Sequence, residues 1–325
     1  MRRPTKPVAA DVRRFLPPGG IALVALAGAV VAHATGVERD FRLDPALVAE
    51  LAASASPRDR ALAADAIAQV DNRVGDAAAI DRRNALLAEA ATAAPDDAFV
   101  QWLAYAYVQP ATADSARKLV ASDPGNGAVW MTPLRLATAA NDTAGIDAAL
   151  AGMAAATRYD EHFADYLIAW VDLYARSPGV APPVAQAQAF ARAAAVAIPA
   201  YKPLVDACTA PKAASMPASR GDACEASARL MTAGPTLIAQ TIGHAVLRRS
   251  GRATQADAET ERTLRWMIGS GGYPDEKDRE DDTYRSIADW RETGNEIEVM
   301  RRARLRAGLP LVPPPDWTWT PPAPK

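Results

Sequence analysis

The sequence is poor in histidine and cysteine, the residues that most often bind transition metals in proteins. It contains three histidines (His33, His162 and His244) and two cysteines (Cys208 and Cys224) among 325 residues. None of the histidines belongs to an H-E-x-x-H motif or lies at another close ligand spacing. The cysteines are 16 positions apart and lack the C-x-x-C pairing of a zinc site. We therefore expect no metal site and no cofactor.

Motifs for nucleophilic or phosphate chemistry are missing as well. The chain has no G-x-S-x-G, no G-x-x-x-x-G-K-[ST] and no G-x-G-x-x-G after a strand. Carboxylates are plentiful, but their neighbours single none of them out, so no catalytic residue is predicted. An exported hydrolase that uses the acidic residues near His162 stays open as an alternative function.

The chain also lacks an excess of positive charge. Its net charge is −2, and the first 34 residues hold five basic side chains and one acidic one, so the remainder carries about −6. A nucleic-acid-binding protein needs a basic face to displace counterions from phosphates. The charge therefore argues against a nucleic-acid partner.

No segment shows the period-two alternation of a β-strand. Half of the residues are hydrophobic, aromatics make up only 6%, and alanine supplies much of the apolar content. Alanine is the strongest intrinsic helix former. The composition therefore predicts an all-α fold.

The N-terminal residues 1–34 resemble an export signal. Five basic residues precede an uncharged run of 12 residues, Ile21–Ala32, and Ala32-His33-Ala34 matches the small-x-small pattern of signal peptidase. The run is short for a membrane span of about 20 residues. A cleaved signal is favoured over a single N-terminal membrane anchor, and a buried cytosolic helix is the least favoured alternative. Either export route places the body on the periplasmic side of a bacterial-type cell envelope.

In such an oxidising compartment, Cys208 and Cys224 are expected to form a disulfide. The intervening segment contains two prolines and one glycine, which predicts a loop. The alternative is a pair of free cysteines that pack as small hydrophobic residues.

The middle of the chain carries a recurring pattern of paired helices. A DPGN turn at residues 123–126 leads to Trp130, and a PDDA sequence at residues 95–98 precedes Trp102 in the same way. Trp102 and Trp130 stand 28 residues apart, against a period of about 34 in tetratricopeptide repeats. Over about residues 80–175 the sequence resembles degenerate tetratricopeptide (TPR) repeats. The resemblance implies stacked antiparallel helical hairpins in a TPR-like α-solenoid.

We divide the chain into four parts: a signal peptide or anchor at 1–34, a helical-repeat domain at 44–200, a C-terminal helical region with a disulfide loop at 201–308, and a Pro/Trp-rich tail at 309–325. Within the third part, residues 278–306 are predicted to form one highly charged helix.

By its resemblance to TPR proteins, the chain is expected to be a non-catalytic interaction module that binds another envelope protein or a peptide on a concave helical face. The residues predicted to line that face are Trp102, Tyr105, Trp130 and Arg135. A place in the core is the alternative for Trp102 and Trp130. A purely structural envelope protein without a groove is a further alternative.

The tail adds Trp317 and Trp319 as candidate partner-binding residues. Two residues two positions apart in an extended chain point the same way. Docking of the tail on the body, a disordered tail and an anchor for a partner remain open as alternatives.

Overall fold

The computed structural model describes residues 43–70, 77–106, 111–196, 199–209, 216–269 and 279–318. The predicted signal at residues 1–34 and the candidate residue Trp319 lie outside these ranges. The described residues form helices and contain no β-strand, so the predicted all-α class is confirmed. The helices are α2 (Pro45–Ala52), α3 (Pro57–Val70), α4 (Ala77–Ala93), α5 (Ala98–Ala106), α6 (Ala113–Ser122), the 3₁₀ helix η2 (Gly127–Trp130), α7 (Met131–Ala139), α8 (Thr143–Ala155), α9 (Phe163–Ala175), α10 (Pro182–Val196), α11 (Lys202–Cys208), α12 (Ala218–Thr232), α13 (Leu237–Arg249), α14 (Gln255–Gly269), α15 (Arg279–Thr293) and α16 (Glu296–Arg306).

Local capping explains where several helices begin. Asp44 accepts a hydrogen bond from the Ala46 N–H at 2.9 Å, and proline follows it at the first helical position of α2. At the start of α6, Thr112 and Ser115 form a reciprocal capping box. Asn295 accepts from two backbone N–H groups at the start of α16. These side chains satisfy donors that a helix N-terminus leaves without an intrahelical partner.

The charged segment at 278–306 is two helices, so the prediction of one continuous helix is wrong. The break falls at Gly294, whose φ of 59° is a left-handed conformation that glycine adopts without steric cost. Asn295 then caps α16. A single glycine among strong helix formers is a weak indication of a helix end. Here Gly294 separates α15 from α16.

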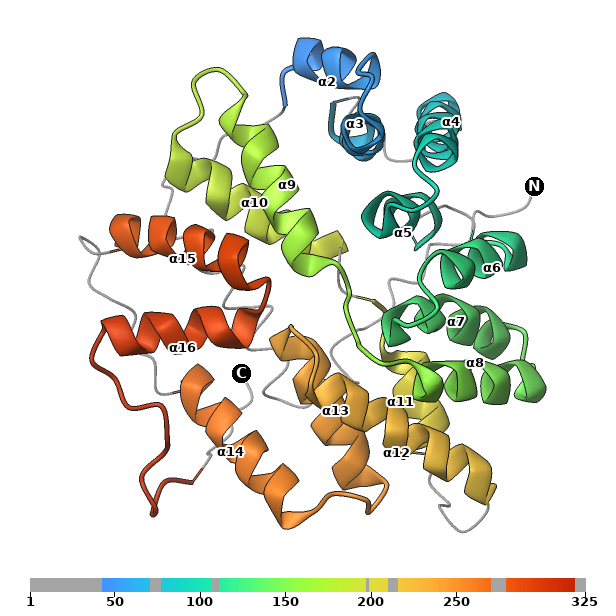
Figure 1. The fold of residues 1–325 in the computed structure, drawn as a ribbon, viewed down its shortest axis with the longest axis vertical. Helices are drawn as coiled ribbons and strands as arrows, with labels where there is room; N and C mark the ends of the chain where they lie inside the picture. The colour runs from blue at the N-terminus through green and yellow to red at the C-terminus, as the bar shows by residue number, and fades with distance from the viewer. Residues whose placement is uncertain are drawn as a thin grey trace, which may run out of the picture.

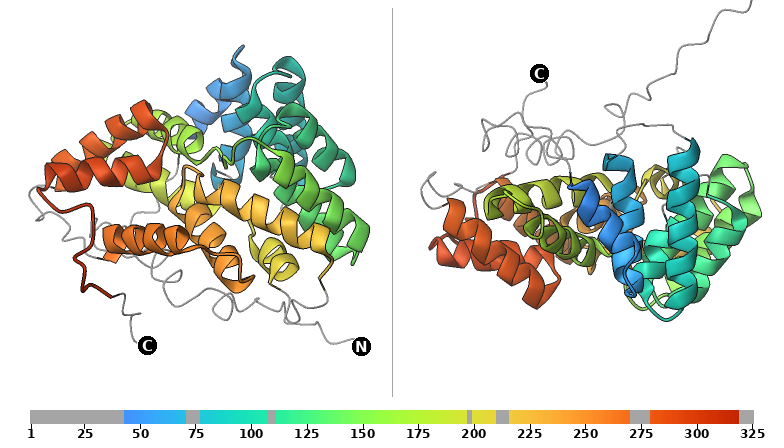
Figure 2. Two further views of the ribbon diagram at one scale, coloured as in Figure 1. Left: turned by 60° about the horizontal axis from the view of Figure 1, so that its bottom comes forward. Right: turned by 90° about the horizontal axis from the view of Figure 1, so that it is seen from above.

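From α2 to α8 each helix packs against the next, and later neighbours such as α9 and α10, α12 and α13, and α15 and α16 also form pairs. Helices that are distant in sequence pack together as well: α9 and α10 contact α15, and α12 contacts α8. In Figure 1, α2–α8 follow one side of the molecule while α9, α10, α15 and α16 form the other side. Figure 2 shows α15 and α16 as a pair at the end opposite α4–α8. Paired helices are therefore present, but a regular solenoid is not confirmed.

The largest apolar core joins the two sides. It contains side chains from α2, α3 and α5 together with Tyr166 and Trp170 of α9 and Trp290 of α15. A second core holds α7, α8, α11, α12 and α13 together. Both cores contain residues from segments that are far apart in the sequence, so each depends on the full helical array.

Cys208 and Cys224 form the predicted disulfide, with their Cα atoms 5.5 Å apart. Cys208 ends α11, and Cys224 lies inside α12, which begins at Ala218. The predicted loop between the cysteines therefore ends before the second one. Both cysteines are buried in the second core, where the bond ties α11 to α12.

Candidate functional site

A groove of about 590 Å³ lies between α2, α3 and α5 on one side and α9 and α15 on the other. Its floor is apolar, since each of the five helices contributes at least one buried or half-buried hydrophobic side chain to it. They include Leu51, Leu62, Phe99, Ile168, Leu173 and Trp290. The first core supports this floor from behind, so the helices that form the groove are fixed relative to one another.

The rim of the groove carries three exposed arginines, each paired with a carboxylate. Arg58 donates to Asp97 at 2.6 Å, Arg176 donates to Glu50 at 2.8 Å, and Arg291 donates to both oxygens of Asp172. These pairs neutralise the arginines. They are exposed, so each contributes little to stability.

The Arg58–Asp97 pair also shifts the protonation equilibria at the rim. The hydrogen bond from Arg58 to Asp97 raises the pKa of the guanidinium. Burial alone would raise the pKa of Asp97, but the bonds from Arg58 and from the N–H groups of Val100 and Phe99 outweigh it, so the carboxyl pKa is lowered. Asp97 therefore stays ionised while it caps α5.

Two further rim carboxylates, Asp59 and Asp165, accept hydrogen bonds from uncharged or weakly basic groups. Asp59 accepts from the Ser54 hydroxyl at 2.8 Å. Asp165, whose side chain is 52% exposed, lies 3.0 Å from Nδ1 of His162. With the three arginines already paired, these two carboxylates give the groove a negative balance.

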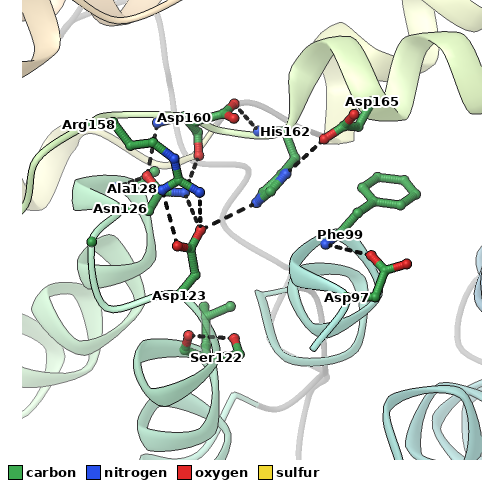
Figure 3. Close-up of polar contacts among 12 residues, drawn as sticks. Asp97, Phe99, Ser122, Asp123, Asn126, Ala128, Arg158, Asp160, His162 and Asp165 are labelled. Carbon is green, nitrogen blue, oxygen red and sulfur yellow. Dashed lines mark hydrogen bonds and ion pairs between the residues drawn. The ribbon is translucent and has the colours of Figure 1, made fainter. Parts of the chain in front are cut away.

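His162 connects Asp165, which lines the groove, to a polar cluster formed by Asp123, Asn126, Arg158 and Asp160 (Figure 3). Its backbone is left-handed, with φ of 55°, and its N–H donates to the Asp160 carboxylate at 2.8 Å. The ring lies between Asp165 on the Nδ1 side and Asp123 on the Nε2 side, at 3.0 and 3.9 Å. Arg158 donates to both oxygens of Asp123, at 3.1 and 2.8 Å. Asp123 therefore lies between the His162 ring and the Arg158 guanidinium.

Asn126, which is fully buried, connects the backbone segments that meet in this cluster through its side-chain hydrogen bonds. Its side chain donates to the Asp160 carbonyl at 2.8 Å and accepts from the Asp160 N–H at 2.9 Å. Its oxygen also accepts from the Ala128 N–H and so caps η2. The DPGN turn thereby fastens the α6–η2 junction to the α8–α9 junction (Figure 3).

The surroundings of His162 limit its chemistry. The ring packs against Phe99 and Trp102, with centroids 6.3 and 5.6 Å away, and the residue is only 4% exposed. Within the described residues its Nε2 has no hydrogen-bond partner. A general base must reach the proton that it removes. The nitrogen faces the protein interior, so this geometry favours a role in positioning Asp165.

The structure separates the predicted partner-binding residues instead of gathering them on one face. Trp102 is buried in the first core, where it contacts Tyr166 edge-on. Trp130 is half-buried, with its ring against Gly152. Tyr105 lies near the Lys118 ammonium, and Arg135 is exposed on α7. Trp317 lies against Trp266 of α14.

The groove residues were not predicted from the sequence. Arg58, Phe99, Ile168 and Trp290 lie on four different helices, and no local motif connects them. The one available indication was the acidic sequence around His162, which does place Asp165 at the groove.

Comparisons with known proteins give no relative: no family model, no curated protein and no solved structure matches this chain. Among the described helices, none is long and apolar enough to cross a membrane. The described residues also contain no group of three or more His, Cys, Asp or Glu side chains that would hold a metal ion.

Proposed function

We propose that this protein is a non-catalytic interaction module of the cell envelope, exposed on the periplasmic side, and that its groove binds a polypeptide segment of another envelope protein. The supporting observation is the groove itself, with its apolar floor and charged rim. Binding sites are commonly concave, largely apolar and supplied with a few polar groups that set orientation.

The rim indicates the chemistry of that segment. Asp59 and Asp165 remain after the rim arginines are paired, so the groove attracts positive charge. The buried side chains of Leu62, Phe99 and Trp290 attract an apolar group. The matching ligand is a segment with a large apolar side chain beside a lysine or arginine.

Site-specific photocrosslinking in the native envelope tests this proposal. A photoreactive amino acid at Ile168 faces the groove, whereas the same group at Ile80 lies on the exposed surface of α4 and serves as the matched control. We expect one polypeptide to crosslink from position 168 only, through a segment with the basic and apolar character described above. Asp165→Asn should weaken that crosslink. Identical products from both positions, or none from position 168, would contradict the proposal.

The location has a separate test. N-terminal sequencing of the mature protein should begin at Thr35 if the predicted signal is cleaved after Ala34. An intact N-terminus on a membrane-bound protein would favour the anchor, and an intact soluble protein would contradict export.

The alternative of an exported hydrolase rests on Asp123 and Asp165, which flank His162. The buried ring disfavours it. Envelope extracts and defined peptides or esters, incubated with the unaltered protein and with His162→Ala, would reveal a turnover that depends on the histidine. Such turnover would replace the interaction module as the proposed function.

A further inference from the structure

The first residues of the C-terminal tail lie along α14 and α16, and every side-chain hydrogen bond described between the two is donated by the helices. Arg262 donates to the carbonyls of Pro314, Pro315 and Trp317. Trp266 Nε1 donates to the Pro310 carbonyl at 3.0 Å. These contacts join residues that are 44 to 55 positions apart.

This set of donors is complementary to a proline-rich chain. Proline has no backbone N–H, so consecutive prolines such as Pro313–Pro315 offer carbonyl acceptors and an apolar surface. Proline-rich segments bind to surfaces that combine aromatic rings with hydrogen-bond donors, and their stiff extended conformation lowers the entropic cost of binding. The α14 surface supplies both, since the Trp266 ring contacts the Trp317 ring edge-on at 5.4 Å.

Arg304 of α16 fixes one end of this surface. It is only 5% exposed, and it donates to the Pro310 carbonyl at 2.7 and 3.1 Å. It also donates to the Met267 carbonyl in the last turn of α14 and lies 5.6 Å from the centre of the Trp266 ring. A cation is favoured at a helix C-terminus, so α14 and Trp266 hold the guanidinium independently of the tail. The Arg304 guanidinium is therefore held in position by α14 and α16 themselves.

The tail itself is more exposed than Arg304. Val312 is 65% exposed, and Pro314, Pro315 and Asp316 are exposed as well, although Pro313 is buried. Gly308, with φ of 66°, directly follows the C-cap of α16, and the Leu309 N–H donates to the Arg304 carbonyl at 2.9 Å, so the tail leaves the helix through a defined turn. Side-chain donors of α14 and α16 thus retain a segment in which several residues are open to solvent.

From these observations we infer that the α14–α16 face is a binding site for proline-rich segments of another protein, which this chain occupies with its own residues 309–318. The tail is an intramolecular ligand that the partner segment displaces. This site is distinct from the groove at α9 and does not depend on the function proposed for it.

A labelled peptide with the sequence of residues 309–318 is the probe, and fluorescence anisotropy is the readout. The full chain is compared with a tail-weakened full chain that carries Pro314→Gly and Trp317→Ala, which leaves the α14 donors intact. We expect the peptide to bind the tail-weakened chain about tenfold or more tightly than the unaltered chain, because apparent affinity scales with the fraction of open sites. A scrambled peptide without consecutive prolines should not bind.

Arg262→Ala, introduced into the tail-weakened chain, should reduce peptide affinity about tenfold, since it removes charge-assisted hydrogen bonds. Arg262→Lys keeps the charge without the forked donors and should also lose affinity, and circular dichroism verifies the fold of each variant. Equal binding by the Arg262 variants, or no binding to the tail-weakened chain, would overturn the inference. So would a dimer of the unaltered chain that tail weakening abolishes, because the face would then bind a second copy.

Discussion

The Thr236 hydroxyl donates a hydrogen bond to Oε2 of Glu161 across 2.6 Å inside the protein. The Tyr201 hydroxyl donates to the other oxygen of the same carboxyl group. Glu161 is 2% exposed, and these bonds connect the segment before α9 with the starts of α11 and α13. Burial raises the pKa of Glu161 to about 8: the hydrogen bond from Thr236 opposes this rise, and the charges of Asp160 and Glu296 add to it. The junction is therefore built around a carboxyl group that is protonated at neutral pH.

Because the pKa of Glu161 is raised in the folded protein, we expect the stability of the protein to depend on pH. The folded-state pKa of about 8 lies above the ordinary value of 4.5, so the folded protein binds more protons than the unfolded chain between these values. The stabilisation is complete below about pH 4.5 and is lost as the pH rises through about 8. Glu161→Gln should flatten this dependence and stabilise the protein at about pH 9 by roughly 1–3 kcal/mol.

Urea unfolding at a series of pH values measures the effect. Glu89→Gln, at an exposed position on α4, is the matched control and should leave the pH profile unchanged. Burial also raises the pKa of Glu296 to about 7, so Glu161→Gln should leave a smaller residual slope. An unaltered slope in Glu161→Gln would show that the carboxyl group does not titrate in this range.

Local sequence determined much of the fold but not the groove. Alanine-rich segments and caps such as Asp44 act within a few residues, so the helices were predictable from their own sequences. The disulfide followed from the presence of only two cysteines. The burial of Glu161 and the meeting of Phe99 with Trp290 at one groove depend on packing between segments distant in sequence. No local pattern encodes such contacts, and none distinguishes Trp102, which lies in the first core, from an aromatic residue on a binding face.

A buried ion pair between α3 and α10 predicts strong coupling between two substitutions. Arg192 Nη2 lies 2.9 Å from Asp65 Oδ2, both side chains are largely buried, and the guanidinium stacks on the Trp170 ring at 3.8 Å. Asp65→Ala leaves the charge of Arg192 unpaired and should cost about 3–5 kcal/mol of unfolding free energy. Arg192→Leu should cost a similar amount.

The double variant provides the check. Removing both charges leaves neither unpaired, so Asp65→Ala with Arg192→Leu should destabilise less than the two single variants added together. Urea unfolding of the four proteins gives the coupling energy. Additive losses would show that the pair does not act as a unit.

The Cys208–Cys224 bond predicts a redox-dependent stability. In the chain-entropy model, a loop of 16 residues contributes roughly 3 kcal/mol by restricting the unfolded chain. Reduction, or the double substitution to serine, should lower the thermal midpoint, and the serine variant should no longer respond to the reductant. A midpoint that is the same in oxidised and reduced protein would contradict the prediction.

The contact between α12 and α13 depends on the absence of a side chain at Gly243. A Cβ atom there would lie 2.6 Å from the Ala228 carbonyl oxygen and 3.0 Å from the Thr232 nitrogen, which are backbone atoms of α12. Alanine normally stabilises a helix interior by up to about 1 kcal/mol relative to glycine. Here the two helices must separate, so Gly243→Ala should destabilise the protein by about 1–3 kcal/mol.

Gly221, in the same helix pair, is the matched control. A Cβ atom at that position would meet only the tip of the Arg252 side chain, at 3.5 Å. Gly221→Ala should therefore show the intrinsic gain of about 0.5–1 kcal/mol, because no backbone has to move. Thermal unfolding of Gly221→Ala and Gly243→Ala compares their stabilities with that of the unaltered protein. If Gly243→Ala were as stable as Gly221→Ala, α12 and α13 would not approach each other as closely as the structure has them.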